Sequence, residues 1–118
     1  ALTKIFPEFE GKIGGSGIRV PVPDGSLTDI TCYVKRQVSI EEINEAFKKA
    51  AENDLKGILA YTEDPIVSVD IIGNRNSCLF DAQLTSVIDK MVKVVGWYDN
   101  EIGYSSRIID LILYVTAK

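Results

Sequence analysis

The chain has 118 residues, of which 46% are hydrophobic and 25% charged, a balance that indicates one folded domain and excludes a disordered tail. Its formal net charge of -4 argues against non-specific binding to nucleic acid or to a membrane surface. The chain contains no histidine, so it has no histidine base, no histidine metal ligand and no Ser–His or Cys–His dyad of its own, and we expect no metal site.

Residue usage also indicates a cellular compartment. Two cysteines, Cys32 and Cys78, are too few for the disulfide framework of a secreted domain, and we expect Cys32 to be a small buried strand residue. No apolar run approaches the roughly 18 residues of a membrane span, and the first residues lack the pattern of a signal peptide. We therefore expect a cytoplasmic protein, and a first residue other than Met agrees with a fragment of a longer one.

Glycine and proline punctuate the segment before the first clear strand. Pro7 would end any helix that enters from upstream. Pro21 and Pro23, which follow Ile18–Val20, restrict that segment to an edge strand or a strand end. The Asp24-Gly25 pair predicts a turn. The alternating run 26–38 then predicts a strand. Its core face is expected to carry Thr28, Ile30, Cys32 and Val34.

The motif Ser39-Ile40-Glu41-Glu42 predicts the start of a helix. The Ser39 hydroxyl can accept a hydrogen bond from the Glu42 amide while the Glu42 carboxylate reaches back to Ser39, which forms a capping box. Polar residues and Gly57 end the helix. The apolar residues of this helix lie on one stripe: Ile40, Ile43, Phe47 and Ala50.

Four apolar runs after this helix predict short strands, at 58–62, 67–72, 84–88 and 91–97. The Asp89-Lys90 pair is short enough to join the last two strands as a hairpin. Together with the helices, these strands indicate an α+β domain with a mixed, largely antiparallel sheet covered by helices.

The run 101–117 predicts a C-terminal helix with an unusual distribution of apolar residues. One sheet in a domain of this size can cover only one side of such a helix. The other side therefore predicts a missing surface, supplied by another domain or another subunit. The apolar residues cover far more than one stripe: Ile108, Ile109, Leu111, Ile112, Leu113 and Val115.

Two segments carry polar residues in positions that suit a binding site. Arg19 is the only charged residue among its strand-like neighbours, so it forms either a structural ion pair or a contact to a buried anion. Trp97–Glu101 joins the last strand to the last helix. In that turn Asp99 or Asn100 serves either as the helix N-cap or as a site residue.

Three stretches of the chain carry a family resemblance: KIFPEFEGKIGGSGIRVPVPDGSLTDITCYV, LKGILAYTEDPIVSVD and MVKVVGWYDNEIGYSSRIIDL. Together they resemble the C-terminal part of phosphorylating glyceraldehyde-3-phosphate dehydrogenase, from Ala1 to about Val115. The resemblance implies a homotetrameric enzyme of glycolysis. It would convert glyceraldehyde 3-phosphate, inorganic phosphate and NAD to 1,3-bisphosphoglycerate and NADH.

The resemblance further implies that residues 1–118 are the C-terminal portion of the catalytic domain. The family's Rossmann domain, which binds most of the NAD, has no counterpart in this sequence. The family's nucleophile segment, Ser-Cys-Thr-Thr-Asn-Cys, and its catalytic histidine have none either. We therefore expect the chain alone to be inactive.

The same resemblance implies roles for residues of this sequence. Arg19 matches the arginine that binds the substrate phosphate, and Asn100 matches the asparagine that hydrogen-bonds the nicotinamide carboxamide. Tyr98 matches a tyrosine that borders the reacting centre. Glu101 and Tyr104 line the same cofactor region with weaker roles. None of these residues is expected to be the nucleophile or the base.

Two other interpretations stay open at this point. A fragment of erythrose-4-phosphate dehydrogenase, a relative, would share these elements. A free-standing, non-enzymatic interaction domain could also derive from the family. Upstream sequence with a Rossmann fingerprint and the nucleophile segment would favour an enzyme, and a start codon just before Ala1 would favour the interaction domain. The preference for NAD or NADP depends on residues outside this chain.

Overall fold

The computed structural model describes residues 2–117. Within them one five-stranded sheet is accompanied by α1 (Leu2–Ile5), α2 (Ile40–Glu52) and α3 (Ile102–Thr116). The strands are β1 (Ser26–Tyr33), β2 (Leu59–Thr62), β3 (Cys78–Asp81), β4 (Ser86–Ile88) and β5 (Met91–Tyr98). Short 3-10 helices lie at η1 (Pro7–Phe9), η2 (Ser68–Ile71) and η3 (Ala82–Leu84).

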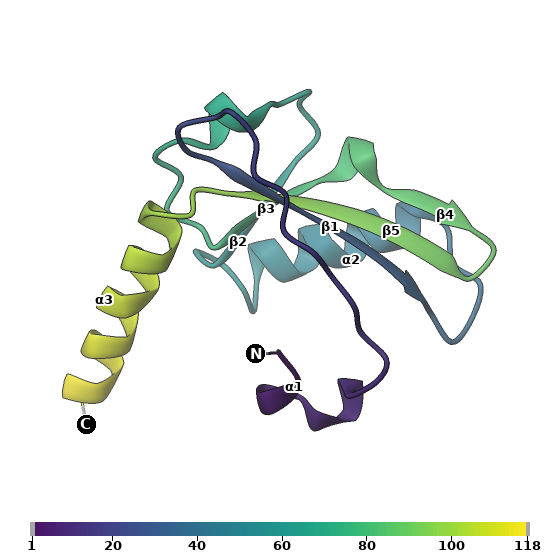
Figure 1. Ribbon diagram of the computed structural model, residues 1–118, viewed down its shortest axis with the longest axis horizontal. Coiled ribbons are helices and arrows are strands. Elements are labelled where there is room, and N and C mark those ends of the chain that lie inside the picture. Colours follow the sequence, from purple (N-terminus) through teal and green to yellow (C-terminus); the bar gives the residue numbers. More distant parts are fainter. Residues whose placement is uncertain (1, 118) are drawn as a thin grey trace.

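The sheet is organised around β5 (Figure 1). β1 pairs antiparallel with β5 along its whole length, with Ser26 opposite Tyr98 at one end. The other edge of β5 pairs antiparallel with β3 and with β4, and β2 extends the sheet parallel to β3. The predicted β4–β5 hairpin is present, and its turn residue Asp89 has a φ of 56°, which aspartate tolerates. The predicted mixed, largely antiparallel sheet is confirmed.

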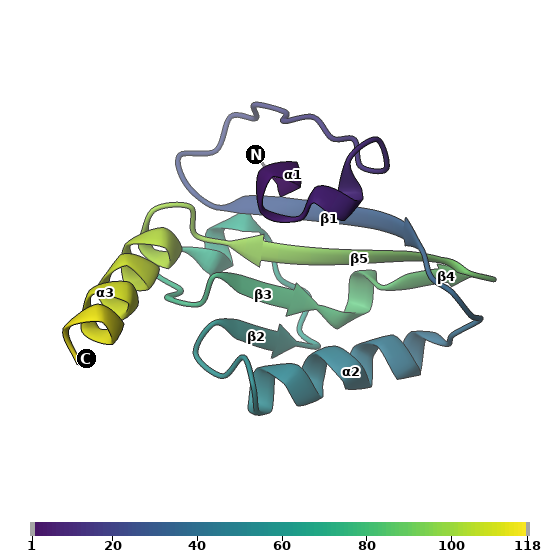
Figure 2. The ribbon, with the colours of Figure 1, turned by 90° about the horizontal axis from the view of Figure 1, so that it is seen from below.

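Helix α2 begins with the predicted capping box. The Ser39 hydroxyl accepts from the Glu42 amide at 3.2 Å, and the Ser39 amide donates to the Glu42 carboxylate at 3.0 Å. Its apolar stripe packs on β2 and β3, where the Phe47 ring stacks on Phe80 with centroids 4.0 Å apart. Phe80 is only 1% exposed, so the core lies between α2 and this half of the sheet (Figure 2).

The predicted core face of β1 is wrong. Every residue of β1 after Ser26 is exposed, and Ile30 retains 52% of its accessible surface. The cause is the position of α2, which packs on β2 and β3 and leaves the edge strand on the far side of β5 uncovered (Figure 2). Cys32, predicted to be buried, is exposed for the same reason.

Two of the strand predictions are wrong, one entirely and one in part, because local hydrogen bonds turn the chain there. The run 67–72 folds as η2, because the Asp70 carboxylate accepts from the Val67 amide at 2.8 Å and draws the chain into a turn. In the run 84–88 only Ser86–Ile88 is a strand, because the Asp81 carboxylate accepts from Gln83 and starts η3.

Two further differences from the predicted elements lie in the segment before β1 and in the segment after β2. Ile18–Val20 forms no strand, and the chain from 13 to 25 has no helix or strand. β3 begins at Cys78, in a stretch that the sequence alone marks only as a turn leading toward a strand.

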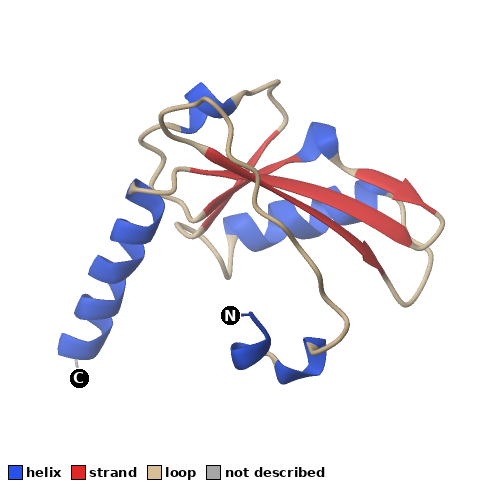
Figure 3. Ribbon diagram, viewed as in Figure 1, coloured by secondary structure: helices blue, strands red, loops and turns tan. Residues whose placement is uncertain are grey.

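Helix α3 projects away from the sheet (Figure 3). Gly103 is its only buried residue within the described range, and its apolar side chains face outward, with Leu111 at 61% and Val115 at 62% exposure. The sheet therefore covers neither side of α3, whereas one covered side was expected. The finding strengthens the expectation of a missing partner surface. No helix among residues 2–117 is long and apolar enough to cross a membrane.

We expect the purified chain to self-associate through α3, because exposed apolar patches drive association. Gel filtration at micromolar concentration is expected to show oligomers. Two lysines on the apolar surface, in the variant Leu111→Lys/Val115→Lys, should shift the chain toward a monomer. Ile18→Lys serves as the control, since Ile18 is 83% exposed but lies outside α3. A wild-type chain that elutes as a stable monomer would contradict this expectation.

Candidate functional site

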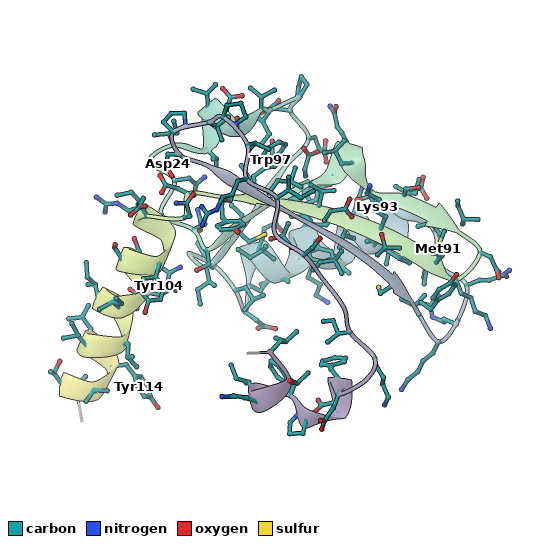
Figure 4. The ribbon with its side chains drawn as sticks, in the orientation of Figure 1. Asp24, Met91, Lys93, Trp97, Tyr104 and Tyr114 are labelled. Atoms are coloured by element: carbon teal, nitrogen blue, oxygen red, sulfur yellow. The ribbon has the colours of Figure 1, made fainter. Side chains whose placement is uncertain are left out.

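An open pocket lies where β5 ends and α3 begins, with a volume of about 360 Å³. Among the side chains around it are Tyr98, Asn100 and Tyr104, three of the residues predicted for the site (Figure 4 labels Tyr104). A second open pocket, between the start of α2 and the β4–β5 hairpin, contains none of them. The remaining residues that line the first pocket are Ser77, Asp99, Gly103 and Arg107.

The turn before α3 is held by Asp99, which is 1% exposed. One carboxylate oxygen accepts from the Glu101 and Ile102 amides, both at 2.8 Å, and the other accepts from the Gly73 amide at 2.8 Å. The hydrogen bond from Gly73, followed by those from Ile102 and Glu101, holds the pKa of Asp99 below its usual value. Of the two candidate helix caps in the sequence, Asp99 is therefore the one that caps α3.

Asn100 makes a different set of contacts. Its amide oxygen accepts from the Ser26 hydroxyl at 3.0 Å, and its amide nitrogen donates to the Glu101 carboxylate at 3.4 Å. Neither contact caps the helix, so Asn100 lines the pocket without its side chain holding the start of α3. Sequence analysis did not single out Ser26, because only the pairing of β1 with β5 brings it beside Asn100.

Close packing sets the position of α3 against the pocket. A Cβ atom at Gly103 would lie 3.1 Å from the Asn76 carbonyl oxygen, so glycine lets the first turn approach the preceding loop. Arg107 donates to the Gly57 carbonyl at 3.1 Å and to the Ser77 hydroxyl at 3.2 Å, and it pairs with Asp110 at 2.8 Å. Arg107 thus anchors the helix rather than presenting a free cation to the pocket.

Arg19 lies outside this pocket, in the irregular segment that leads into β1. It is exposed, and no side chain within residues 2–117 forms an ion pair with it. The described residues therefore form no ion pair with Arg19, and they do not bury its guanidinium as a buried anion contact would require. The described residues contain no group of three or more cysteine, aspartate or glutamate side chains placed to hold a metal ion.

Comparisons with known proteins agree with the pattern of this turn. The family described as glyceraldehyde 3-phosphate dehydrogenase, C-terminal domain, matches residues 1–100. The chain is 54% identical over 115 residues to glyceraldehyde-3-phosphate dehydrogenase 1 of Streptomyces avermitilis, an alignment that covers 98% of this chain and 34% of the relative. It is 50% identical over 119 residues to glyceraldehyde-3-phosphate dehydrogenase 1 of Bacillus subtilis, covering 100% of this chain and 36% of the relative.

A third relative, glyceraldehyde-3-phosphate dehydrogenase of Mycobacterium avium, is 52% identical over 115 residues, with 98% of this chain and 34% of the relative covered. The chain thus spans about a third of the length of the curated relatives it matches. The family match extends through the pocket turn as far as Asn100. On this evidence the chain belongs to the family of the glyceraldehyde 3-phosphate dehydrogenase C-terminal domain.

Proposed function

We propose that this chain is the C-terminal portion of the catalytic domain of a phosphorylating, NAD-dependent glyceraldehyde-3-phosphate dehydrogenase. The full-length parent would be a cytoplasmic homotetramer that converts glyceraldehyde 3-phosphate, inorganic phosphate and NAD to 1,3-bisphosphoglycerate and NADH. Identity of 50–54% to dehydrogenases of this name, over nearly the whole chain, supports the proposal. The nucleophile, the base and most of the NAD contacts would come from the remainder of the parent.

The observation that carries the proposal is the presentation of Asn100 at the pocket. After its contacts to Ser26 and Glu101, the amide retains one N–H and one oxygen lone pair. A nicotinamide carboxamide offers the complementary acceptor and donor, so the residues present fit NAD. When bound, NAD accepts the hydride, and the part assigned to Asn100 is to fix the rotation of the nicotinamide ring.

The other site residues are assigned by position. Arg19, with no ionic partner in the described chain, would bind the substrate phosphate through its guanidinium. Tyr98 and Tyr104 line the pocket and would border the reacting centre and the cofactor. Glu101 would act mainly by holding the amide nitrogen of Asn100.

An assay of the full-length protein tests the function. NADH formation from glyceraldehyde 3-phosphate, phosphate and NAD is expected, and the 118-residue chain alone serves as the inactive control. A clear preference for erythrose 4-phosphate would instead identify the related dehydrogenase. A full-length protein that oxidises neither sugar phosphate would contradict the proposal and favour an interaction domain.

Replacing Asn100 tests the nicotinamide contact. Asn100→Asp keeps the shape but replaces the donor with a charge beside Glu101, and Asn100→Ala removes both polar groups. Both changes are expected to slow hydride transfer and to weaken NAD by about 1 kcal/mol or more. Thermal stability should change little, because Asp99 and not Asn100 caps α3.

Steady-state kinetics with NAD and a melting curve make this measurement. Ser86→Asp adds the same charge at an exposed position of β4 and should leave both readouts unchanged. Normal turnover and normal NAD affinity in Asn100→Asp would show that the amide has no part in cofactor binding.

A further inference from the structure

We propose that Ser26 is a positioning residue that fixes the rotation of the Asn100 amide. The inference rests on the proposed function, in which that amide binds nicotinamide, and it adds a residue from a distant part of the chain. Ser26 opens β1 and precedes Asn100 by 74 positions, yet its hydroxyl lies 3.0 Å from the Asn100 amide oxygen.

The contacts determine which end of the amide faces which partner. Glu101 lies 3.4 Å from the Asn100 nitrogen, and an ionised carboxylate can only accept hydrogen bonds. The NH2 group of Asn100 must therefore face Glu101, which places the amide oxygen toward Ser26. It follows that the Ser26 hydroxyl donates and the Asn100 oxygen accepts. Rotating the amide by half a turn would set the Asn100 oxygen against the Glu101 carboxylate, whereas the Ser26 hydroxyl can donate or accept and would keep a contact in either orientation.

The two residues differ in how firmly the backbone holds them. Ser26 sits in a continuous antiparallel ladder, opposite Tyr98, so its side chain leaves the sheet on the same face as the Tyr98 ring. Asn100 lies in the turn between β5 and α3. The terminal torsion of an asparagine has a broad, nearly two-fold preference, so the backbone alone does not choose between the two amide orientations.

Asp99 fixes the backbone of the same turn but does not touch the amide. Its carboxylate is occupied by the amides of Gly73, Glu101 and Ile102. Asp99 therefore sets where Asn100 stands, Glu101 sets which end of the amide carries the donor, and Ser26 holds the amide plane at that rotation. Loss of the Ser26 hydroxyl is expected to affect the orientation of a bound carboxamide rather than the fold.

The test is a double-mutant cycle in the full-length enzyme. Ser26→Ala is expected to slow hydride transfer about 3- to 10-fold, the range for one net hydrogen bond, with a melting temperature close to that of the wild type. Ser26→Thr keeps a hydroxyl and should recover most of the rate. In the Asn100→Ala background, Ser26→Ala should cause no further loss, because its effect passes through the amide.

Ser86→Ala is the matched control. Ser86 is also the first residue of a strand of this sheet, and its side chain makes no hydrogen bond within the described residues. Removal of the Ser86 hydroxyl should leave the rate of hydride transfer unchanged. The rate is measured as the pre-steady-state formation of NADH, with the KM for NAD determined in parallel.

Each alternative outcome is decisive. Equal losses for Ser26→Ala in both backgrounds would show that Ser26 acts through the fold and would overturn the inference. A normal rate in Ser26→Ala beside a slow Asn100→Ala would overturn the role of Ser26 while leaving the proposed function intact. A normal rate in Asn100→Ala would refute the nicotinamide contact itself, and the inference with it.

Discussion

Arg19→Ala in the full-length enzyme is expected to lower kcat/KM for glyceraldehyde 3-phosphate by roughly 10- to 150-fold. The estimate follows from a charge-assisted contact to phosphate, worth about 1.5–3 kcal/mol. Arg19 is exposed and has no ionic partner among residues 2–117, so its guanidinium is accessible to a ligand. Steady-state kinetics with glyceraldehyde, which lacks the phosphate, should show a much smaller loss.

Two further variants sharpen the Arg19 test. Arg19→Lys keeps the charge but loses the planar fork, and an intermediate loss is expected. Arg36→Ala removes an arginine from the opposite end of β1, where it pairs with Glu42 at the surface, and should leave both substrates unaffected. Equal losses on phosphorylated and unphosphorylated substrate in Arg19→Ala would mean that Arg19 serves the fold instead.

Asp99→Asn is expected to destabilise the protein at neutral pH by about 1.5–3 kcal/mol, the range for losing a hydrogen bond to a charged group. The asparagine has one oxygen, so its NH2 group would face a backbone amide that needs an acceptor. Either Gly73 or the pair Glu101 and Ile102 then loses its partner. Amide hydrogen exchange at these positions should accelerate more than exchange in the core strands.

The pH dependence of this effect has a definite sign. Backbone hydrogen bonds, first from Gly73 and then from Ile102, lower the pKa of Asp99 in the folded protein. The stabilisation is therefore complete above the usual carboxyl pKa of about 3.9 and disappears as the pH falls through the lowered value. Unfolding curves of wild type and Asp99→Asn should converge toward low pH.

A surface aspartate provides the control for Asp99. Asp64 is exposed, and its carboxylate makes no hydrogen bond or ion pair within the described residues. Asp64→Asn should change the free energy of unfolding by less than about 0.5 kcal/mol at any of these pH values. A pH profile for Asp99→Asn that runs parallel to the wild type would contradict the proposed linkage.

Local signals in the sequence predicted the local structure well. The capping box at Ser39 places the start of α2, because its two hydrogen bonds join residues that are neighbours in the chain. The Asp89-Lys90 turn and β5 are also predicted correctly, because the signals for both lie within a few neighbouring residues. The site turn is local too: the pattern Trp97–Glu101 offered Asp99 or Asn100 as the cap of the last helix, and the Asp99 carboxylate accepts from the amides at its start.

The wrong predictions depend on packing between elements and on specific side-chain hydrogen bonds, which the pattern of apolar and polar residues does not encode. The alternating residues of β1 predict one apolar and one polar face. Whether the apolar face is buried depends on which strands α2 covers, and α2 covers β2 and β3 but not β1. The run 67–72 is apolar enough for a strand, yet the side chain of Asp70 competes for the backbone and Ile71 is buried as part of η2. Ser26 escaped notice because its partner lies 74 residues away.

The sheet order has a consequence for the time at which this chain can fold on a ribosome. Among the described strands, β1, β3 and β4 all hydrogen-bond to β5, and β2 joins the sheet only through β3. Of these five strands β1 is synthesised first, but its only pairing partner among them is β5, which is synthesised last of the five. Until Met91–Tyr98 has left the exit tunnel, the nascent chain can form α2 and the β2–β3 pair. The edge of β1 that will pair with β5 has no neighbouring strand during that time. Such late, long-range closure slows folding and exposes unpaired strand edges during synthesis.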